Sequence, residues 1–347
     1  MEGPFNDMKS FISKVKPRQI RTFFFVLGLV LFAYLIFKLN PAKLWAELSK
    51  IGPNIVWILI PTATSYFAYA WAWEIFLLGT GARVPYWDIF KIKVSGEAIN
   101  SITPLSWGGG DPARVYLLKE HVPVNAGAAS VVVDRTLNNL AVALFMIIGV
   151  AMAFLKFKFP PQLTVGLLIA LFVIIGFSVF FYIRSHEGLF EFFLDTLKKL
   201  RIKRHFSEST MARVREIDGH ISEFYRNNKA GFFKAFGLHF YSRLQSPIEI
   251  FLVAKFMGFP LSFVECYLLG SLTILVNLIF VFVPGAFGVM EGAYAGTFSL
   301  FHLDPIIGAS IQIIRRIRML LWTALGFLFM YQLREQDGPV VQKPISG

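Results

Sequence analysis

The sequence predicts an all-α polytopic membrane protein with about six full transmembrane helices and two re-entrant helical hairpins, arranged as an inverted-topology repeat. Of its 347 residues, 55% are hydrophobic and only 16% are charged, and the mean hydropathy is +0.58. This composition lies outside the range of soluble globular domains. Apolar runs of about 20 residues, the length that crosses a bilayer, recur along the chain, and two further runs are interrupted by proline and glycine.

The uninterrupted apolar runs predict the full spans. A basic segment precedes the first run, but the run is long and no A-x-A cleavage site follows, so an uncleaved span is expected rather than a signal peptide. The predicted spans are 22–38, 54–78, 127–155, 163–182, 233–257 and 306–331.

The two interrupted runs predict re-entrant hairpins. One comprises 88–104 followed by 112–125, and the other comprises 262–283 followed by 288–303. Irregular backbone at membrane depth must be buried in protein or face a watery cavity, because lipid offers its N–H and C=O groups no partners. The predicted turn residues are Pro104, Gly108, Gly109, Gly110, Pro284 and Gly288.

The distribution of lysine and arginine predicts the topology. With the N-terminus in the cytoplasm, the inside segments hold 22 basic residues and the outside segments hold 5, as the positive-inside rule requires. Both termini are then cytoplasmic, and a plasma-membrane location is expected. The predicted organisation is a cytoplasmic amphipathic N-terminus at 1–21 and one transmembrane domain at 22–347, which contains repeat A (about 54–155), a cytoplasmic amphipathic insert (183–231), repeat B (about 233–331) and a cytoplasmic tail (332–347).

An internal repeat relates the two hairpins. Adding 180 to a residue number takes Asp111 to Glu291 and Arg135 to Arg315, and it also matches the proline and glycine of each break. Because the charge count starts the two copies on opposite sides of the membrane, the repeat has inverted topology. Transporters are commonly built in this way around a site near the midplane.

Ionisable residues inside the apolar runs indicate the binding site. Each costs about 2.5–3.5 kcal/mol at a helix centre, so such residues usually face a cavity or pair with one another. Two arginines, one from each copy, would converge on a phosphate-like anion, and helix N-termini after Gly110 and Gly288 would add N–H groups. Internal ion pairs are the structural alternative. The predicted substrate-binding residues are Asn100, Asp111, Arg114, Asp134, Arg135, Asn138, Asn277, Glu291, Arg315 and Arg316.

Several function classes are disfavoured. The single cysteine, Cys266, excludes an intrachain disulfide and a cysteine-based metal cage. The six histidines are scattered, so neither a metal site nor a cofactor is predicted. The phosphate-binding loop GxxxxGK[ST] is absent, which disfavours an ATP-driven pump. No nucleophile–base pair stands out, so no catalytic residue is predicted, and no nucleic-acid partner is expected.

Two amphipathic stretches indicate contact with a membrane surface. Residues 187–204 place leucines and phenylalanines on one helical face beside a cluster of lysines and arginines, and residues 1–16 also have an apolar face. Both are expected to lie on the anionic cytoplasmic leaflet, although a solvated positive loop also fits 187–204. A homo-oligomer is left open.

The chain resembles a known family. "PLSWGGGDPARVYLLKEHVPVNAGAASVVVDRTLNNL" (104–140) and "PGAFGVMEGAYAGTFSLF" (284–301), followed by "GASIQIIRRIRMLLW", resemble the lysylphosphatidylglycerol synthase transmembrane (flippase-like) family. The resemblance covers roughly 20–333 and implies movement of a lipid or lipid-linked head group between leaflets. The best-known members continue into a cytoplasmic aminoacyltransferase domain. The sequence ends about fifteen residues after its last predicted span, so a stand-alone member without that domain is expected.

These inferences together predict a lipid translocase that does not use ATP, and not an enzyme. Arg135, Arg315 and Arg114 would hold the phosphate of a phospholipid, aminoacyl-phospholipid or lipid-linked substrate, while Asp111 and Glu291 would contact the head group or gate. Two alternatives remain. One is a secondary transporter of a small soluble anion. The other is an integral-membrane lipid-modifying transferase, whose acid or base would be Asp111 or Asp134.

Overall fold

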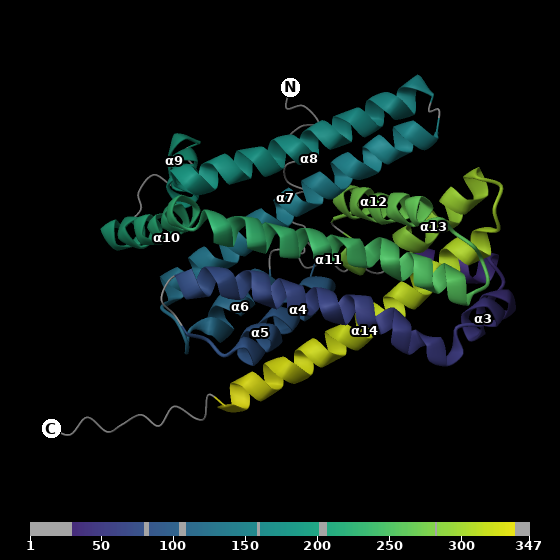
Figure 1. Ribbon diagram of the computed structural model, residues 1–347, viewed down its shortest axis with the longest axis horizontal. Coiled ribbons are helices and arrows are strands. Elements are labelled where there is room, and N and C mark those ends of the chain that lie inside the picture. The colour runs from purple at the N-terminus through teal and green to yellow at the C-terminus, as the bar shows by residue number, and fades with distance from the viewer. Residues whose placement is uncertain are drawn as a thin grey trace, which may run out of the picture.

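The computed structural model describes residues 30–79, 83–103, 109–157, 160–200, 207–281 and 283–336, and within these ranges the fold is all-helical. Figure 1 shows long helices running roughly alongside one another, with the shorter helices beside them. The long helices are α4 (Ile55–Gly79), α7 (Val124–Lys156), α8 (Pro161–Glu187), α11 (Lys229–Phe256) and α14 (Pro305–Gln336). The shorter ones are α3 (Pro41–Ser49), η1 (Gly52–Asn54), α5 (Tyr86–Ile102), α6 (Gly110–Leu118), α9 (Leu189–Lys199), α10 (Glu208–Asn227), α12 (Phe263–Ile279), η2 (Pro284–Ala286) and α13 (Val289–Leu300).

The long helices correspond to the predicted spans. Three helical stretches, Gly52–Gly79, Val124–Lys156 and Thr164–Glu187, are long and apolar enough to cross a membrane, and they match the spans predicted at 54–78, 127–155 and 163–182. Helices α11 and α14 are as long but carry more charged residues, because they supply much of the polar site described below. Only the helical segment 30–38 of the first predicted span lies within the described residues.

Each interrupted run forms two short helices. Helices α5 and α12 each have 17 residues, and α6 and α13 have 9 and 12, so each is shorter than the roughly 20 residues of a full span. Gly109 immediately precedes α6. Gly288 immediately precedes α13 with φ 74°, a left-handed conformation that favours glycine. Pro284 begins η2 inside the second break, while Pro104 and Gly108 lie outside the described residues.

Equivalent helices of the two halves make equivalent contacts. Within the first half, α4 packs on α5, α5 on α6, and α6 on α7; within the second, α11 packs on α12, α12 on α13, and α13 on α14. Between the halves, α4 lies against α11 (Figure 1). The contact of α5 with α14 has its counterpart in the contact of α7 with α12. The halves therefore enclose a shared interior.

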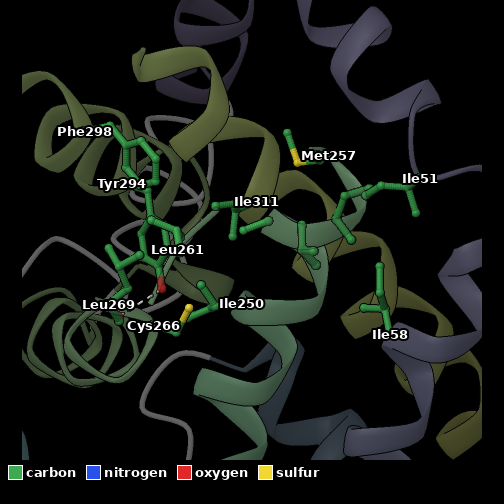
Figure 2. Packing of buried hydrophobic residues seen from close by; sticks show 13 residues of the cluster. Ile51, Ile58, Ile250, Met257, Leu261, Cys266, Leu269, Tyr294, Phe298 and Ile311 are labelled. Carbon is green, nitrogen blue, oxygen red and sulfur yellow. Dashed lines mark hydrogen bonds between the residues drawn. The ribbon is translucent and has the colours of Figure 1, made fainter. Parts of the chain in front are cut away.

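An apolar core anchors the second half to the first. Figure 2 shows Ile58 of α4, Ile250 and Met257 of α11, Tyr294 of α13 and Ile311 of α14 as members of one cluster of buried side chains. All five side chains are buried. Lipid tails are as apolar as these side chains, so within a bilayer close van der Waals packing, rather than removal from water, holds such helices together.

The insert between the halves folds against α8. The predicted amphipathic stretch 187–204 forms α9, which starts after Gly188 at φ 104°, while 201–206 and the N-terminal stretch 1–16 lie outside the described residues. The Asp218 carboxylate of α10 accepts hydrogen bonds at 3.1 and 3.0 Å from the backbone N–H groups of Phe190 and Glu191. Partial burial raises the pKa of Asp218. This contact fixes the first turn of α9 on α10.

Candidate functional site

A polar cavity of about 520 Å³ lies between α4, α5, α7, α11, α12 and α14. Its wall comes from both halves of the chain, because α4, α5 and α7 belong to the first and α11, α12 and α14 to the second. The predicted substrate-binding residues that line it are Asn100, Asp134, Arg135, Asn138, Asn277, Arg315 and Arg316. The other three, Asp111, Arg114 and Glu291, do not line the cavity, and each forms an ion pair with a residue that does. The binding role of all ten stays a prediction.

A buried carboxylate organises the first half of the wall. Asp134 of α7 is 4% exposed. Its Oδ2 contacts Lys93 Nζ of α5 and lies 2.9 Å from Arg114 Nη2 of α6, while its Oδ1 lies 3.3 Å from His239 Nε2 of α11. Arg114 is fully buried and stacks 4.0 Å above the Trp73 ring. One carboxylate therefore ties α7 to three other helices, and the adjacent Asp134 and Arg135 do not pair with each other.

The second carboxylate of this half stands at the start of α6. Arg135 donates from Nε and Nη2 to the two oxygens of Asp111 at 2.7 and 2.8 Å, a bidentate pair that fixes both side chains. The Gly110 N–H donates to Asn100 Oδ1 at 3.0 Å. A Cβ atom on Gly110 would lie 2.2 Å from the carbonyl oxygen of Gly96, so glycine permits this close approach of α6 to α5.

In the second half, Arg315 is the most extensively bonded cation. Its guanidinium donates to Glu249 of α11 at 3.2 Å, to the Tyr294 hydroxyl at 2.8 Å, to Ser246 at 2.9 Å and to Thr273 at 3.1 Å. Glu249 also pairs with Arg318 at 2.6 Å. Arg318 is thus held by a buried carboxylate in an internal ion pair.

The ion pair between Arg316 and Glu291 lies at the break between α12 and α13. Arg316 donates to Glu291 Oε1 at 2.6 Å and to the carbonyl oxygen of Gly285 at 3.1 Å, and it stacks 3.9 Å from the Phe287 ring. The carboxylate at the start of α13 thus pairs with Arg316, and not with Arg315 as the offset of 180 residues implies. Neighbouring helix residues point about 100° apart, so one residue of rotation in α14 exchanges the two arginines.

One cavity arginine has no carboxylate partner among the described residues. Arg243 of α11 donates to the Tyr69 hydroxyl and, at 2.8 Å, to Asn138 Oδ1, and its Nε has no hydrogen-bond partner in the described part of the chain. The same holds for two buried amide nitrogens in the wall, Asn100 Nδ2 and Gln312 Nε2. These three buried nitrogens belong to residues that line the cavity.

The charges around the cavity leave an excess of positive charge. The cations of the wall and its direct partners are Lys93, Arg114, Arg135, Arg243, Arg315, Arg316 and Arg318, and the carboxylates are Glu97, Asp111, Asp134, Glu249 and Glu291. With His239 neutral, two cations exceed the carboxylates. This excess of positive charge suits the cavity to an anion. No group of three or more metal-ligating side chains occurs within the described ranges.

The sequence did not identify every residue of this site. Lys93 lies within the interrupted run 88–104 and was not among the predicted binding residues, yet it is 3% exposed and paired with Asp134. Arg243 stood out only as a charge inside an apolar run. Tyr69, Glu97 and His239 gave no recognisable signal, because a single tyrosine, glutamate or histidine near an apolar run is equally compatible with a helix that binds no ligand.

The arrangement can be set beside known proteins. Residues 24–326 match the family described as the lysylphosphatidylglycerol synthase TM region. The chain belongs to this family. It is similar to a UPF0104 membrane protein of Methanothermobacter thermautotrophicus, with 23% identity over 84% of this chain and 89% of that protein. It is also similar to a UPF0104 membrane protein of Methanocaldococcus jannaschii, with 25% identity over 95% of this chain and 98% of that protein.

Family membership places the cavity within the shared part of the chain. The match to the lysylphosphatidylglycerol synthase transmembrane family begins before α3 and ends within α14, so every helix that lines the cavity lies wholly or largely inside it. The chain is therefore a helical membrane protein of this family, and the polar cavity belongs to its membrane domain.

Proposed function

We propose that this protein moves a lipid with an anionic, phosphate-type head group between membrane leaflets without ATP. The polar cavity carries the proposal. Arginines from both halves line it, and a surplus of cations faces a space enclosed by apolar helices. A phosphate cannot cross hydrocarbon without replacing its hydration. In the proposal, the side chains of Arg243, Asn100 and Gln312 turn their buried unpaired nitrogens toward the phosphate to supply these hydrogen bonds.

A second cavity favours a lipid over a small soluble anion. An apolar space of about 430 Å³ lies between α7, α8, α12 and α13. Helix α12 separates the two spaces, because Thr273 and Asn277 face the polar cavity whereas Leu272 and Leu275 face the apolar one. A head group and a hydrocarbon chain would find separate surfaces on the two sides of this helix. A soluble anion would have no use for the apolar space.

The proposed mechanism needs the inverted repeat. We take α5–α6 and α12–α13 as re-entrant hairpins, and Thr103 after α5 and Gly285 before α13 line the cavity. The equivalent contacts of the two halves support this arrangement. Rocking of one half against the other would open the cavity to each leaflet in turn. Both termini would be cytoplasmic, in the plasma membrane. Helix α9, with Phe193 exposed beside Lys198 and Lys199, would rest on the anionic leaflet.

The structure gives less support to a transferase. Its acid or base would be Asp111 or Asp134. Asp111 is held by both nitrogens of a bidentate arginine, and Asp134 contacts Lys93 and Arg114. Both oxygens of Asp111 are already bonded to Arg135, and Asp134 is already held by Lys93 and Arg114, so neither carboxylate is free to contact the reacting atoms of a substrate.

Reconstitution in vesicles tests the proposal. Purified protein is placed in liposomes that contain a trace of phosphatidylglycerol labelled on an acyl chain with the fluorophore NBD, and dithionite is added outside to bleach the outer leaflet. Wild-type protein should extend bleaching beyond the outer-leaflet half. Arg243→Gln should slow this phase at least tenfold, whereas Arg334→Gln, an exposed change at the end of α14, should leave it unchanged.

Other outcomes contradict the proposal. Uptake of radiolabelled inorganic phosphate, without movement of the labelled lipid, would assign the site to a soluble anion. A new lipid species that forms during incubation with pure protein would assign it to a transferase. Equal bleaching in protein-free and protein-containing vesicles would exclude phosphatidylglycerol as a substrate. The same assay with labelled phosphatidylethanolamine and phosphatidic acid would then test the head-group class.

A further inference from the structure

A buried histidine beside the cavity has no part in the proposed anion contacts. His239 of α11 is fully buried, and its Nε2 lies 3.3 Å from Asp134 Oδ1. Its Nδ1 has no hydrogen-bond partner among the described residues. Burial of a polar atom without a partner costs free energy, so few such atoms occur in native proteins. A free imidazole nitrogen next to a carboxylate is able to accept a proton.

Direct contacts connect this histidine to the anion-facing arginine. His239 and Arg243 are four residues apart on α11, so their side chains are neighbours on one helical face. Tyr69 of α4 contacts both, since its ring centroid lies 5.3 Å from that of His239 and its hydroxyl accepts a hydrogen bond from Arg243. Lys93 Nζ lies 5.3 Å from the centroid of the same tyrosine ring. Any change of charge at one group therefore reaches the others at short range.

We propose that His239, with Asp134 and Lys93, forms a proton-binding site whose occupation is linked to anion binding at Arg243. The inference rests on the proposed function and deepens it by naming the coupling ion. When the cavity holds no anion, the positive charges of Arg243 and Lys93 oppose a further positive charge on His239. When a phosphate-type anion binds Arg243, it offsets that charge, and protonation of the imidazole becomes easier.

The charged and titratable groups around the histidine all enter this balance. They are Tyr69 from α4, Lys93 and Glu97 from α5, Arg114 from α6, Asp134 from α7 and Arg243 from α11. Lys93 and Arg114 already occupy Asp134 Oδ2, and this leaves Oδ1 to stabilise an imidazolium. The proton is supplied by hydronium, which is left as water, and the lone pair of Nδ1 accepts it, with no bond broken in the protein.

Linkage makes the effect reciprocal. If anion binding promotes proton uptake, then acidification must tighten anion binding by the same factor. A phosphodiester head group carries one negative charge, so one proton taken up with it makes the loaded site neutral relative to the empty one. A proton gradient across the membrane could then bias the distribution of the lipid between leaflets.

Two measurements on the full-length protein test the inference. The first is calorimetric titration of detergent-solubilised protein with dihexanoyl-phosphatidylglycerol, and separately with inorganic phosphate, in buffers of different ionisation enthalpy. The buffer dependence counts protons taken up on binding. Wild type should take up between half a proton and one proton near pH 7, and linkage then requires its affinity to rise about six- to a hundredfold from pH 8 to pH 6. His239→Gln should bind the anion with an uptake below 0.1 proton, and its affinity should not change between pH 8 and pH 6.

The second measurement uses the vesicle assay with a pH gradient of two units. In wild type the gradient should shift the steady-state leaflet distribution of the labelled lipid at least threefold, and His239→Gln should keep the movement but lose the shift. His220→Gln, on α10, is the matched control. Zero proton uptake in the calorimeter, or a distribution that ignores the gradient while lipid still moves, overturns the coupling and leaves the proposed function intact. Proton-linked binding of inorganic phosphate that His239→Gln abolishes, without binding of the lipid, supports the coupling and overturns the lipid assignment.

Discussion

At the scale of single residues, the polar interior depends on charges that cannot be removed one at a time. Arg114 is fully buried between Asp134 and the Trp73 ring. Asp134 has other cationic neighbours, but its burial leaves no water to compensate for a lost charge. Breaking a buried ion pair is far more destabilising than breaking a surface pair, because one charge remains in a medium of low polarity.

We therefore expect Arg114→Met to lower the free energy of unfolding in detergent by about 3–5 kcal/mol. The control is Arg184→Met, which removes the partly exposed pair with Glu187 and should cost less than about 1 kcal/mol. Denaturant titration of both variants measures the difference. Losses of similar size would show that the Arg114 pair is solvated, in contradiction to its burial.

The residues of the site were only partly accessible to sequence reasoning. Arginines and acids inside apolar runs are recognisable because their insertion is costly, and this singled out Asp134 and Arg135. The choice between Arg315 and Arg316 as partner of Glu291 depends on the rotation of α14, which a sequence offset does not contain. His239 became significant only through its neighbours on other helices.

At the scale of elements, the short helix α6 is held where a side chain would not fit. A Cβ on Gly110 would lie 2.2 Å from the carbonyl oxygen of Gly96 and 2.4 Å from Asn100 Oδ1. Helices α5 and α6 must therefore separate if this glycine is replaced. The hydrogen bond from Gly110 to Asn100 would be lost at the same time.

Gly110→Ala should thus destabilise the protein by about 1–3 kcal/mol through overpacking, and it should slow lipid movement because Arg135 loses its aligned partner on α6. Gly176→Ala in α8 meets nothing within 4 Å and should instead be neutral or stabilising by up to about 1 kcal/mol, since alanine is the better helix former. Thermal unfolding and bleaching rates check both. A neutral Gly110→Ala would mean that α6 is free to move.

The elements themselves were well predicted from the sequence. Glycine and proline located both breaks, because few other residues tolerate the backbone conformations required there, and α6 and α13 begin within a residue of the predicted positions. The predicted amphipathic stretch 187–204 was only approximately right. Its start is fixed by Gly188 and by Asp218 of the next helix, which is a tertiary contact.

At the scale of the whole molecule, the proposed cycle requires the two halves to shift against each other. Helices α5 and α14 belong to different halves, and their side chains meet where Ser101 and Thr323 share a hydrogen bond of 2.9 Å. The only native cysteine, Cys266, is buried. A pair of introduced thiols at this contact can therefore be oxidised selectively.

We expect Ser101→Cys/Thr323→Cys to move labelled lipid normally when reduced and to lose at least nine-tenths of the rate when oxidised, with recovery on reduction. The control pair is Asn125→Cys/Glu216→Cys, at a contact of 2.6 Å between α7 and the insert helix α10. It tests whether a cross-link by itself is inhibitory, and this variant should stay active when oxidised. The dithionite assay with and without dithiothreitol measures both pairs. Full activity of the oxidised first pair would exclude relative movement of α5 and α14.

The unequal ion pairs of the two halves carry one more consequence. Asp111 at the start of α6 binds Arg135, the second residue of the sequence pair Asp134–Arg135 on α7. Glu291 at the start of α13 binds Arg316, the second residue of the sequence pair Arg315–Arg316 on α14. The earlier position is therefore negative in one half and positive in the other. Turning the molecule upside down would place each half where the other had been, but the charge at this position would then have the opposite sign. In the proposed cycle, an anion entering from one leaflet would meet a different electrostatic field from one entering from the other, so the half-saturating concentrations on the two sides would differ even where the leaflets are chemically identical.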